Sequence, residues 1–239
     1  MSGHSKWSKI KHKKAITDVK KGKIFSKIAR MISVTAREKG GDPETNSNLR
    51  LAIEKAKSVN MPRENIERAV RRGAGEGEEK LEEVTYEAYG PGGIALIIEG
   101  ITDNKNRAVS EIKHILSKHN GKLAETGSVQ WSFERKGVIT IENKKGEEIE
   151  LKLIEAGAED IKLKDGFLEI YTKVEELEKV KNNLAKEGLT VESVSLDWLP
   201  KNPATIENPK DKEQLEKLFE ALDENDDINE IYSNLAEEV

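Results

Sequence analysis

The chain has 239 residues, of which 36% are hydrophobic and none is cysteine. This length suits two or three packed domains, and the lack of cysteine excludes disulfides and thiolate metal sites. The longest uninterrupted apolar stretch, Ile94 to Ile98, falls far short of the roughly 18 residues that a membrane-spanning helix needs. The basic first 27 residues have no apolar segment and no small-residue cleavage site behind them, so we expect a cytoplasmic protein without a secretory signal.

The net charge of −5 conceals a strong segregation of charge along the chain. Residues 1–73 carry 19 Lys and Arg against 7 Asp and Glu, a net charge of +12, whereas the remainder carries 21 against 38, a net charge of −17. Because segregated charge favours partners of opposite sign, the basic part and the acidic part are expected to meet different partners.

The basic part begins with residues 1–21, which are rich in lysine and poor in apolar periodicity, as in an arm that stays mobile until it binds. Residues 23–39 predict an amphipathic helix, with an apolar side and a charged side that carries Lys23, Lys27, Arg30 and Arg37. Two further helices are predicted near residues 48–59 and 62–72, and Arg68, Arg71 and Arg72 lie opposite the apolar side of the last one.

After a glycine-rich linker at residues 73–80, the hydrophobic period changes to two. Residues 84–89 and 94–102 predict a hairpin, followed by a helix at 104–119 and a strand at 128–134. The hairpin tip, Tyr89-Gly90-Pro91-Gly92-Gly93, has two interpretations. It is a simple turn between strands, or a protruding loop whose lack of side chains allows close approach to a partner.

The next segment has the order strand, helix, strand, strand, helix, strand between residues 138 and 198, which is ferredoxin-like. A helix at 212–222 and a strand at 228–235 would complete the ββαβ set before it. The fold class predicted is therefore α+β with three domains, an N-terminal helical domain and two α/β domains of ferredoxin-like type, one inserted in the other. The predicted bounds are 1–77 for the helical domain, 78–135 plus 204–239 for the discontinuous domain, and 136–203 for the insertion.

The charge pattern predicts nucleic-acid binding by the N-terminal part, although a charge run is usually only a solvated face. Residues 1–39 alone carry 12 basic and 2 acidic side chains, and Trp7 among the lysines suits phosphate contacts plus one stacking platform. The candidate contact residues are Lys6, Trp7, Lys9, Lys11, His12, Lys13, Lys14, Lys20, Lys21, Lys23, Lys27, Arg30, Arg37, Arg68, Arg71 and Arg72.

The sequence offers little support for an enzyme. The glycines at 73–77 follow a helix and precede acids, which is the wrong context for a dinucleotide or phosphate loop. His114 and His119 have only Glu111 nearby, and His4 and His12 lie in the arm. We therefore expect no catalytic residues, metal, cofactor or small-molecule substrate, and no RNA- or DNA-binding signature with identifiable base readers is present.

Six separated segments, in order, resemble the YebC/PmpR family from end to end. They are residues 3–7 (GHSKW), 40–43 (GGDP), 60–69 (NMPRENIERA), 89–93 (YGPGG), 102–107 (TDNKNR) and 127–129 (GSV). Ala88 departs from the glycine expected before the hairpin tip. The resemblance implies three domains, with a helical N-terminal domain followed by two α/β domains.

The resemblance leaves the nucleic acid open. Family members are described as probable transcriptional regulators that bind DNA. Others act on ribosomes, including a mitochondrial translational activator of a cytochrome oxidase subunit and bacterial relatives linked to relief of stalling. The physical pattern, a lysine-rich arm without base-reading helices, suits a folded RNA recognised by shape and phosphate, while DNA shape readout remains an alternative.

Overall fold

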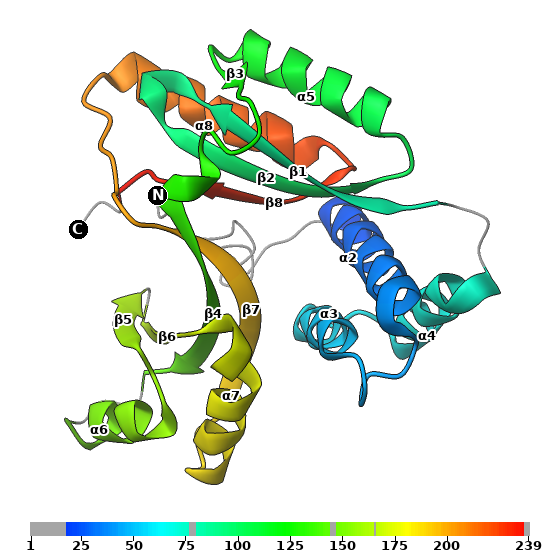
Figure 1. The fold of residues 1–239 in the computed structure, drawn as a ribbon, viewed down its shortest axis with the longest axis vertical. Coiled ribbons are helices and arrows are strands. Elements are labelled where there is room, and N and C mark those ends of the chain that lie inside the picture. The colour runs from blue at the N-terminus through cyan, green and yellow to red at the C-terminus, as the bar shows by residue number, and fades with distance from the viewer. Residues whose placement is uncertain (1–17, 77–79, 144–146, 165, 237–239) are drawn as a thin grey trace. The chain divides into compact units, whose positions relative to one another are not determined.

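The computed structural model describes residues 18–76, 80–143, 147–164 and 166–236. The chain divides into two compact units, Met1–Glu134 with Leu199–Val239, and Arg135–Trp198. Within the described ranges no helix is long and apolar enough to cross a membrane. The α+β class is confirmed, with N-terminal helices followed by two four-stranded antiparallel sheets (Figure 1).

The first unit begins with three helices, α2 (Asp18–Lys39), α3 (Ser47–Ser58) and α4 (Arg63–Arg71). Helix α2 starts at Asp18, so the last residues of the predicted arm are already helical. The apolar sides of the three helices pack on one another through a core that includes Ile32, Leu49 and Ile66. Burial of these side chains, at about 25 cal/mol per Å² of apolar surface, is the main force that holds the bundle together.

The connection between α2 and α3 is fixed by the buried side chain of Asn46. Its Oδ1 accepts the Leu49 N–H at 3.1 Å and caps α3, while its Nδ2 donates to the carbonyls of Thr35 and Gly40, both at 2.8 Å. Gly40 has a φ of +92°, a conformation that glycine adopts without steric penalty. One asparagine thus ends α2 and starts α3.

The prediction of a linker at residues 73–80 is wrong for residues 73–76. Residues Arg72–Glu76 form a short helical segment, η1, that continues from α4 and is kinked at Gly75, where φ is +127°, and residues 77–79 lie outside the described residues. Gly73 is buried against α2, because a Cβ there would stand 2.2 Å from the Ser33 carbonyl oxygen and 2.8 Å from the Ala36 Cβ. The glycine serves close helix packing here, whereas composition alone indicated a flexible connector.

We predict that Gly73→Ala lowers the free energy of unfolding by about 2 to 3 kcal/mol, because the new methyl group overlaps backbone that cannot yield. Gly22→Ala is the matched control. Gly22 lies inside α2 with nothing within 4 Å of its Cβ position, so alanine is expected to stabilise the chain by about 0.5 to 1 kcal/mol through helix propensity. Denaturant unfolding of the two variants checks both signs, and equal stabilities would contradict the packing role of Gly73.

The first sheet has the order β3-β1-β2-β8. Its strands are β1 (Glu82–Tyr89), β2 (Ala95–Thr102), β3 (Lys122–Leu123) and β8 (Ile228–Ser233), all paired antiparallel. Helices α5 (Lys105–Lys118) and α8 (Pro209–Glu224) lie along one face of this sheet (Figure 1). The core between them includes Leu96, Ile98, Ile112, Leu116, Leu215 and Leu218.

Two predictions for this sheet are corrected. The strand predicted at 128–134 is absent as such, because Gln130–Ser132 form a 3₁₀ turn and the strand β4 begins only at Phe133. The short β3 at Lys122–Leu123 supplies the third strand instead. The element order β1, β2, α5, β3, α8, β8 starts with a hairpin and so differs from the ferredoxin-like order βαββαβ.

The second unit does follow the order βαββαβ. Its elements are β4 (Phe133–Glu142), α6 (Glu147–Ala156), β5 (Asp160–Lys164), β6 (Phe167–Thr172), α7 (Leu177–Lys186) and β7 (Val191–Pro200), with the 3₁₀ turn η4 (Val174–Glu176) before α7. The sheet order is β5-β6-β4-β7. Ile139, Leu153, Ile170 and Leu184 are fully buried, so each helix contributes to the core of this unit.

Candidate nucleic-acid interface

Seven of the residues predicted to contact nucleic acid lie outside the described residues. They are Lys6, Trp7, Lys9, Lys11, His12, Lys13 and Lys14. Lys20 lies in α2, and nothing is described of its side chain. The remaining candidates lie on α2 and at the end of α4, and the structure gives these two groups different surroundings.

The basic side chains of α2 contact the end of α8. The Lys27 Nζ donates to the Asp223 carbonyl oxygen at 2.7 Å, and the Lys23 Nζ donates to the Glu224 carbonyl oxygen at 3.3 Å. Helix α8 ends at Glu224 and has no basic residue in its own last turn. Because the carbonyls at a helix C-terminus carry partial negative charge and lack intrahelical donors, the two lysines cap α8 from outside.

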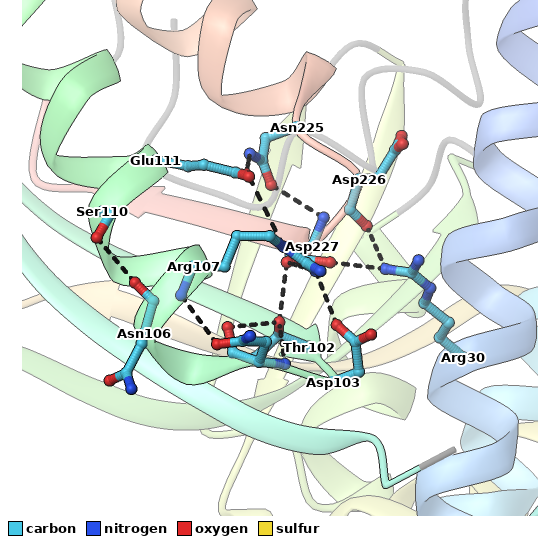
Figure 2. A network of polar contacts seen from close by, with 11 residues as sticks. Arg30, Thr102, Asp103, Asn106, Arg107, Ser110, Glu111, Asn225, Asp226 and Asp227 are labelled. Atoms are coloured by element: carbon cyan, nitrogen blue, oxygen red, sulfur yellow. Dashed lines mark hydrogen bonds and ion pairs between the residues drawn. The ribbon is translucent and has the colours of Figure 1, made fainter. Parts of the chain in front are cut away.

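Asp227 lies at the centre of a polar network that joins α2 to the first sheet and to α5 (Figure 2). Its Oδ1 accepts Arg30 Nη1 at 2.8 Å, and its Oδ2 accepts Arg107 Nη2 at 2.8 Å and Thr102 Oγ1 at 2.9 Å. The backbone N–H of Asp227 donates to Asn225 Oδ1 at 2.9 Å. Asp227 is only 4% exposed, and its charge is held by side chains from two distant segments, α2 and residues 102–107.

The arginine partners determine the protonation state of Asp227. Burial raises the pKa of this carboxyl, but the hydrogen bonds from Arg107, Thr102 and Arg30 outweigh burial and hold the pKa below its usual range. The carboxylate therefore stays charged at neutral pH. The side chains of Arg30 and Arg107 keep about a third or more of their surface exposed. In these two ion pairs the carboxylate is therefore buried, whereas the arginines still reach solvent.

We call the contacts of Lys23, Lys27 and Arg30 with the end of α8 and with Asp227 the joint. Further contacts extend the joint along the charged side of α2 and onto α3. Arg37 Nη1 donates to the Leu81 carbonyl oxygen at 3.1 Å, and Lys55 of α3 pairs with the buried Glu230 of β8. Lys23, Lys27, Arg30 and Arg37 thus all make contacts inside the first unit. The charged side of this helix, predicted to contact nucleic acid, is a packing surface within the first unit, and its role in nucleic-acid binding stays a prediction.

Arg68, Arg71 and Arg72 are exposed at the end of α4. At about 100° per residue they fall within one third of the helix circumference. Arg63, at the start of α4, lies about 140° from Arg68 by the same measure and pairs with Glu67 at 2.6 Å. The three arginines therefore form one basic surface on the helical part of the chain.

The hairpin tip is largely packed against its own unit. Gly90 and Pro91 are buried, and a Cβ on Gly90 would stand 3.0 Å from the Leu215 Cδ1 of α8. Gly92 and Gly93 are exposed with φ values of +70° and +75°. The contacts support the interpretation as a turn between β1 and β2, and contact of this loop with a partner stays a prediction.

Sequence reasoning missed a second buried acid, Glu87 of β1. Its carboxylate accepts the backbone N–H groups of Gly127 at 2.5 Å, Val129 at 2.5 Å and Gln130 at 2.8 Å. Burial raises the pKa of Glu87, but these three donors outweigh it and hold the pKa below its usual range. The backbone of this segment bonds a side chain in place of a neighbouring strand, which explains why the strand predicted at 128–134 does not form.

Several segments that carry the family resemblance take part in the joint around Asp227 and in the hydrogen bonds to Glu87. Residues 102–107 supply Thr102 and Arg107 to Asp227, and Asn104 of the same segment caps α5 by accepting the Arg107 N–H at 3.0 Å. Residues 127–129 form the cradle around Glu87. These motifs therefore have a structural explanation within the chain, which spacing along the sequence did not indicate.

The fold and these surfaces define a multidomain α+β protein with a basic N-terminal helical part. Comparison with known families agrees with this description. Residues 5–76 match the model of the TACO1/YebC protein N-terminal domain, and residues 81–235 match the model of the TACO1/YebC second and third domain. The chain belongs to the TACO1/YebC family, which confirms the resemblance found in the sequence.

Relatives match over essentially the whole chain. A probable transcriptional regulatory protein of Persephonella marina is 51% identical over 98% of this chain and 95% of its own length. One of Halothermothrix orenii, with the same name, is 47% identical over 98% of this chain and 94% of its own. The crystal structure of a conserved hypothetical protein from Aquifex aeolicus is similar with a TM-score of 0.87 and 46% identity, and 98% of each chain is covered.

Proposed function

We propose that this chain is a non-enzymatic regulatory protein that binds nucleic acid through its basic N-terminal part, and that duplex DNA is its target in transcriptional regulation. The observation that carries the proposal is the net charge of +12 on residues 1–73, against −17 on the remainder. Relatives named probable transcriptional regulatory proteins support the regulatory role. Cytoplasmic location follows from such a role.

The contacts of α2 narrow the proposed interface. Since Lys23, Lys27, Arg30 and Arg37 of α2 bind the body of the first unit, the arm at residues 6–14 and the arginine surface of α4 supply the phosphate contacts. Such contacts give affinity and salt dependence without sequence specificity. The arm carries five lysines within these nine residues, and the arginines add three charges at a second point.

We predict that replacing Arg68, Arg71 and Arg72 together with glutamine weakens binding to any duplex about tenfold or more at moderate salt. Each lost phosphate contact removes close to one unit from the slope of log affinity against log salt. Arg63→Gln is the control, because Arg63 lies on another side of the same helix and pairs with Glu67. Fluorescence anisotropy with a labelled duplex at several salt concentrations measures both quantities, and equal slopes for the two variants would contradict the arginine surface.

A second candidate function is that of a ribosome-associated translation factor that uses the same residues on ribosomal RNA. It is favoured by the contacts of α2, since Lys27 and Arg30 of this helix bind Asp223 and Asp227 of the first unit and are not directed at base edges. Recognition by phosphate and shape suits a folded RNA as well as a duplex.

Competition binding separates the two candidates. Labelled protein bound to ribosomes at near-physiological salt is challenged with excess duplex DNA and, separately, with excess unlabelled ribosomes. Release by DNA supports transcriptional regulation, whereas release by ribosomes alone contradicts it and supports the translation factor. Failure of the protein to bind either target would contradict the proposed function as a whole.

A further inference from the structure

The segment held by Glu87 presents an exposed tryptophan. Among the residues that the structure describes, Trp131 is the most exposed large hydrophobic side chain, at 68%, and the others of this kind, Leu151, Ile154, Leu163 and Val174, all belong to the second unit. Tryptophan is highly buried on average and is enriched at interfaces. Its exposure on the first unit therefore makes Trp131 a candidate contact residue, which its surroundings must support.

The orientation of the indole ring is fixed. Trp131 Nε1 donates to the Ser128 carbonyl oxygen at 2.9 Å, and the Tyr89 hydroxyl donates to the same oxygen at 3.2 Å. Ser128 is itself held between Gly127 and Val129, whose N–H groups bind Glu87. Two aromatic side chains from distant segments are thus tied to one carbonyl on a rigid loop, which is the preorganisation that a stacking platform requires.

Cationic side chains accompany both aromatic rings. Lys122 Nζ lies 5.6 Å from the centroid of the Tyr89 ring, and Lys201 Nζ donates to the Trp131 carbonyl oxygen at 2.9 Å. Both lysines are exposed, as are Glu125 and Glu134 on the same stretch of chain. The acid closest to the loop, Glu87, is buried and its charge is already bound by three N–H donors.

These features favour a nucleic acid over a protein as the partner. A protein interface is built around a contiguous apolar centre that is depleted of lysine, whereas Trp131 stands between the polar residues Gln130 and Ser132 and beside Lys201. Aromatic platforms flanked by cations are how proteins bind unpaired strands, since every base has a face to stack and a phosphate nearby.

We propose that Trp131 and Tyr89, with Lys122 and Lys201, form a second nucleic-acid site that stacks an unpaired nucleobase and contacts the adjacent phosphates. This site goes beyond the proposed function, because its four residues lie outside residues 1–73 of the sequence and it selects unpaired strands. Single-stranded RNA and single-stranded DNA share the chemistry that it recognises.

The test compares Trp131→Ala, Trp131→Phe and Leu163→Ala in the full chain. Leu163 is 65% exposed in the second unit and controls for loss of exposed apolar surface. Anisotropy is measured with a labelled single-stranded RNA of mixed sequence, the matching single-stranded DNA, and the duplex DNA. We expect Trp131→Ala to weaken single-strand binding about tenfold, with duplex binding unchanged, while the phenylalanine variant retains most of the affinity and Leu163→Ala all of it.

Comparison of the two single strands shows whether the site prefers RNA or DNA. A contact to the 2′-hydroxyl would make the loss of affinity caused by Trp131→Ala larger for RNA than for DNA. Equal binding of single strands by wild type and Trp131→Ala would overturn the proposal, as would an equal loss on the duplex. Since Trp131 is exposed, its variants are expected to unfold at the wild-type temperature, and this separates loss of contact from loss of fold. Duplex binding by the wild type, together with no effect of Trp131→Ala on single-strand binding, would reject this site and leave the arm in place.

Discussion

Asp227→Asn is expected to lower the free energy of unfolding by about 2 to 3 kcal/mol, because three charged or hydroxyl donors lose their common acceptor charge. Arg30 belongs to α2, Thr102 to β2 and Arg107 to α5, so one substitution loosens three elements together (Figure 2). The arginines regain solvent readily, since both are partly exposed, which keeps the loss below that of a fully buried pair.

Asp226→Asn is the matched control for this variant. Asp226 is adjacent and exposed, and it offers Arg30 only its backbone carbonyl, at 3.2 Å, which asparagine retains. We expect its effect to stay within about 0.5 kcal/mol. Urea unfolding of both variants at neutral pH makes the comparison, and equal stability of the two would show that the Asp227 charge does not hold the joint.

The same carboxylate sets a pH dependence. Its pKa in the folded chain is lower than the usual value of about 3.9 that it has when unfolded. Its contribution to stability is therefore complete above pH of about 4 and is lost as the pH falls through the folded pKa. The difference in stability between wild type and Asp227→Asn is expected to be constant from pH 7 to about 5 and to shrink in more acidic solution.

Local patterns predicted most of the secondary structure. The apolar periodicity near residues 48–59 predicted α3, and the period of two in residues 94–102 predicted β2. These signals are carried by neighbours along the chain, so a single sequence contains them. The βαββαβ order of the second unit followed from the same signals.

The insertion of residues 136–203 between two parts of one domain remains our proposal, as do the three predicted domain ranges. The pairing of β8 with β2 supports the insertion, and so does the return of the chain to the first unit at Leu199. The helical part is not separated from the first sheet by this division, because the contacts of α2 bind it there.

The contacts of Asp227, those of the α8 terminus and the exposed loop at Trp131 could not be predicted from the sequence, for a physical reason. Asp227 lies among Asp223, Glu224 and Asp226, and nothing along the chain marks it as the buried one. Its partners are 120 or more residues away, and so is the α8 terminus that Lys27 caps.

The arm variant Lys9→Glu, Lys11→Glu, Lys13→Glu and Lys14→Glu is expected to have the largest effect on binding. It changes the net charge of residues 1–73 from +12 to +4. Four lost phosphate contacts, each worth close to 0.9 of the salt slope, would flatten that slope by about three to four units. We expect affinity for duplex DNA to fall about a hundredfold or more at 100 mM salt, for a loss of this size.

The control variant, called the body control, changes the total charge by the same amount but at four lysines outside residues 1–73. Lys113, Lys118, Lys152 and Lys186 are exposed on helices α5, α6 and α7, and their replacement by glutamate lowers the net charge by eight outside residues 1–73. Long-range repulsion alone is largely screened beyond about 10 Å at this salt. The control is therefore expected to retain most of the affinity and the wild-type salt slope.

The measurement that tests the central claim most directly is the salt dependence of duplex and ribosome binding by the wild type, the arm variant and the body control, in parallel. If residues 1–73 make the phosphate contacts, the arm variant alone loses affinity and slope on whichever target the wild type binds. If the arm variant binds with wild-type affinity and slope, or if the body control loses as much, the basic N-terminal part is not the nucleic-acid interface.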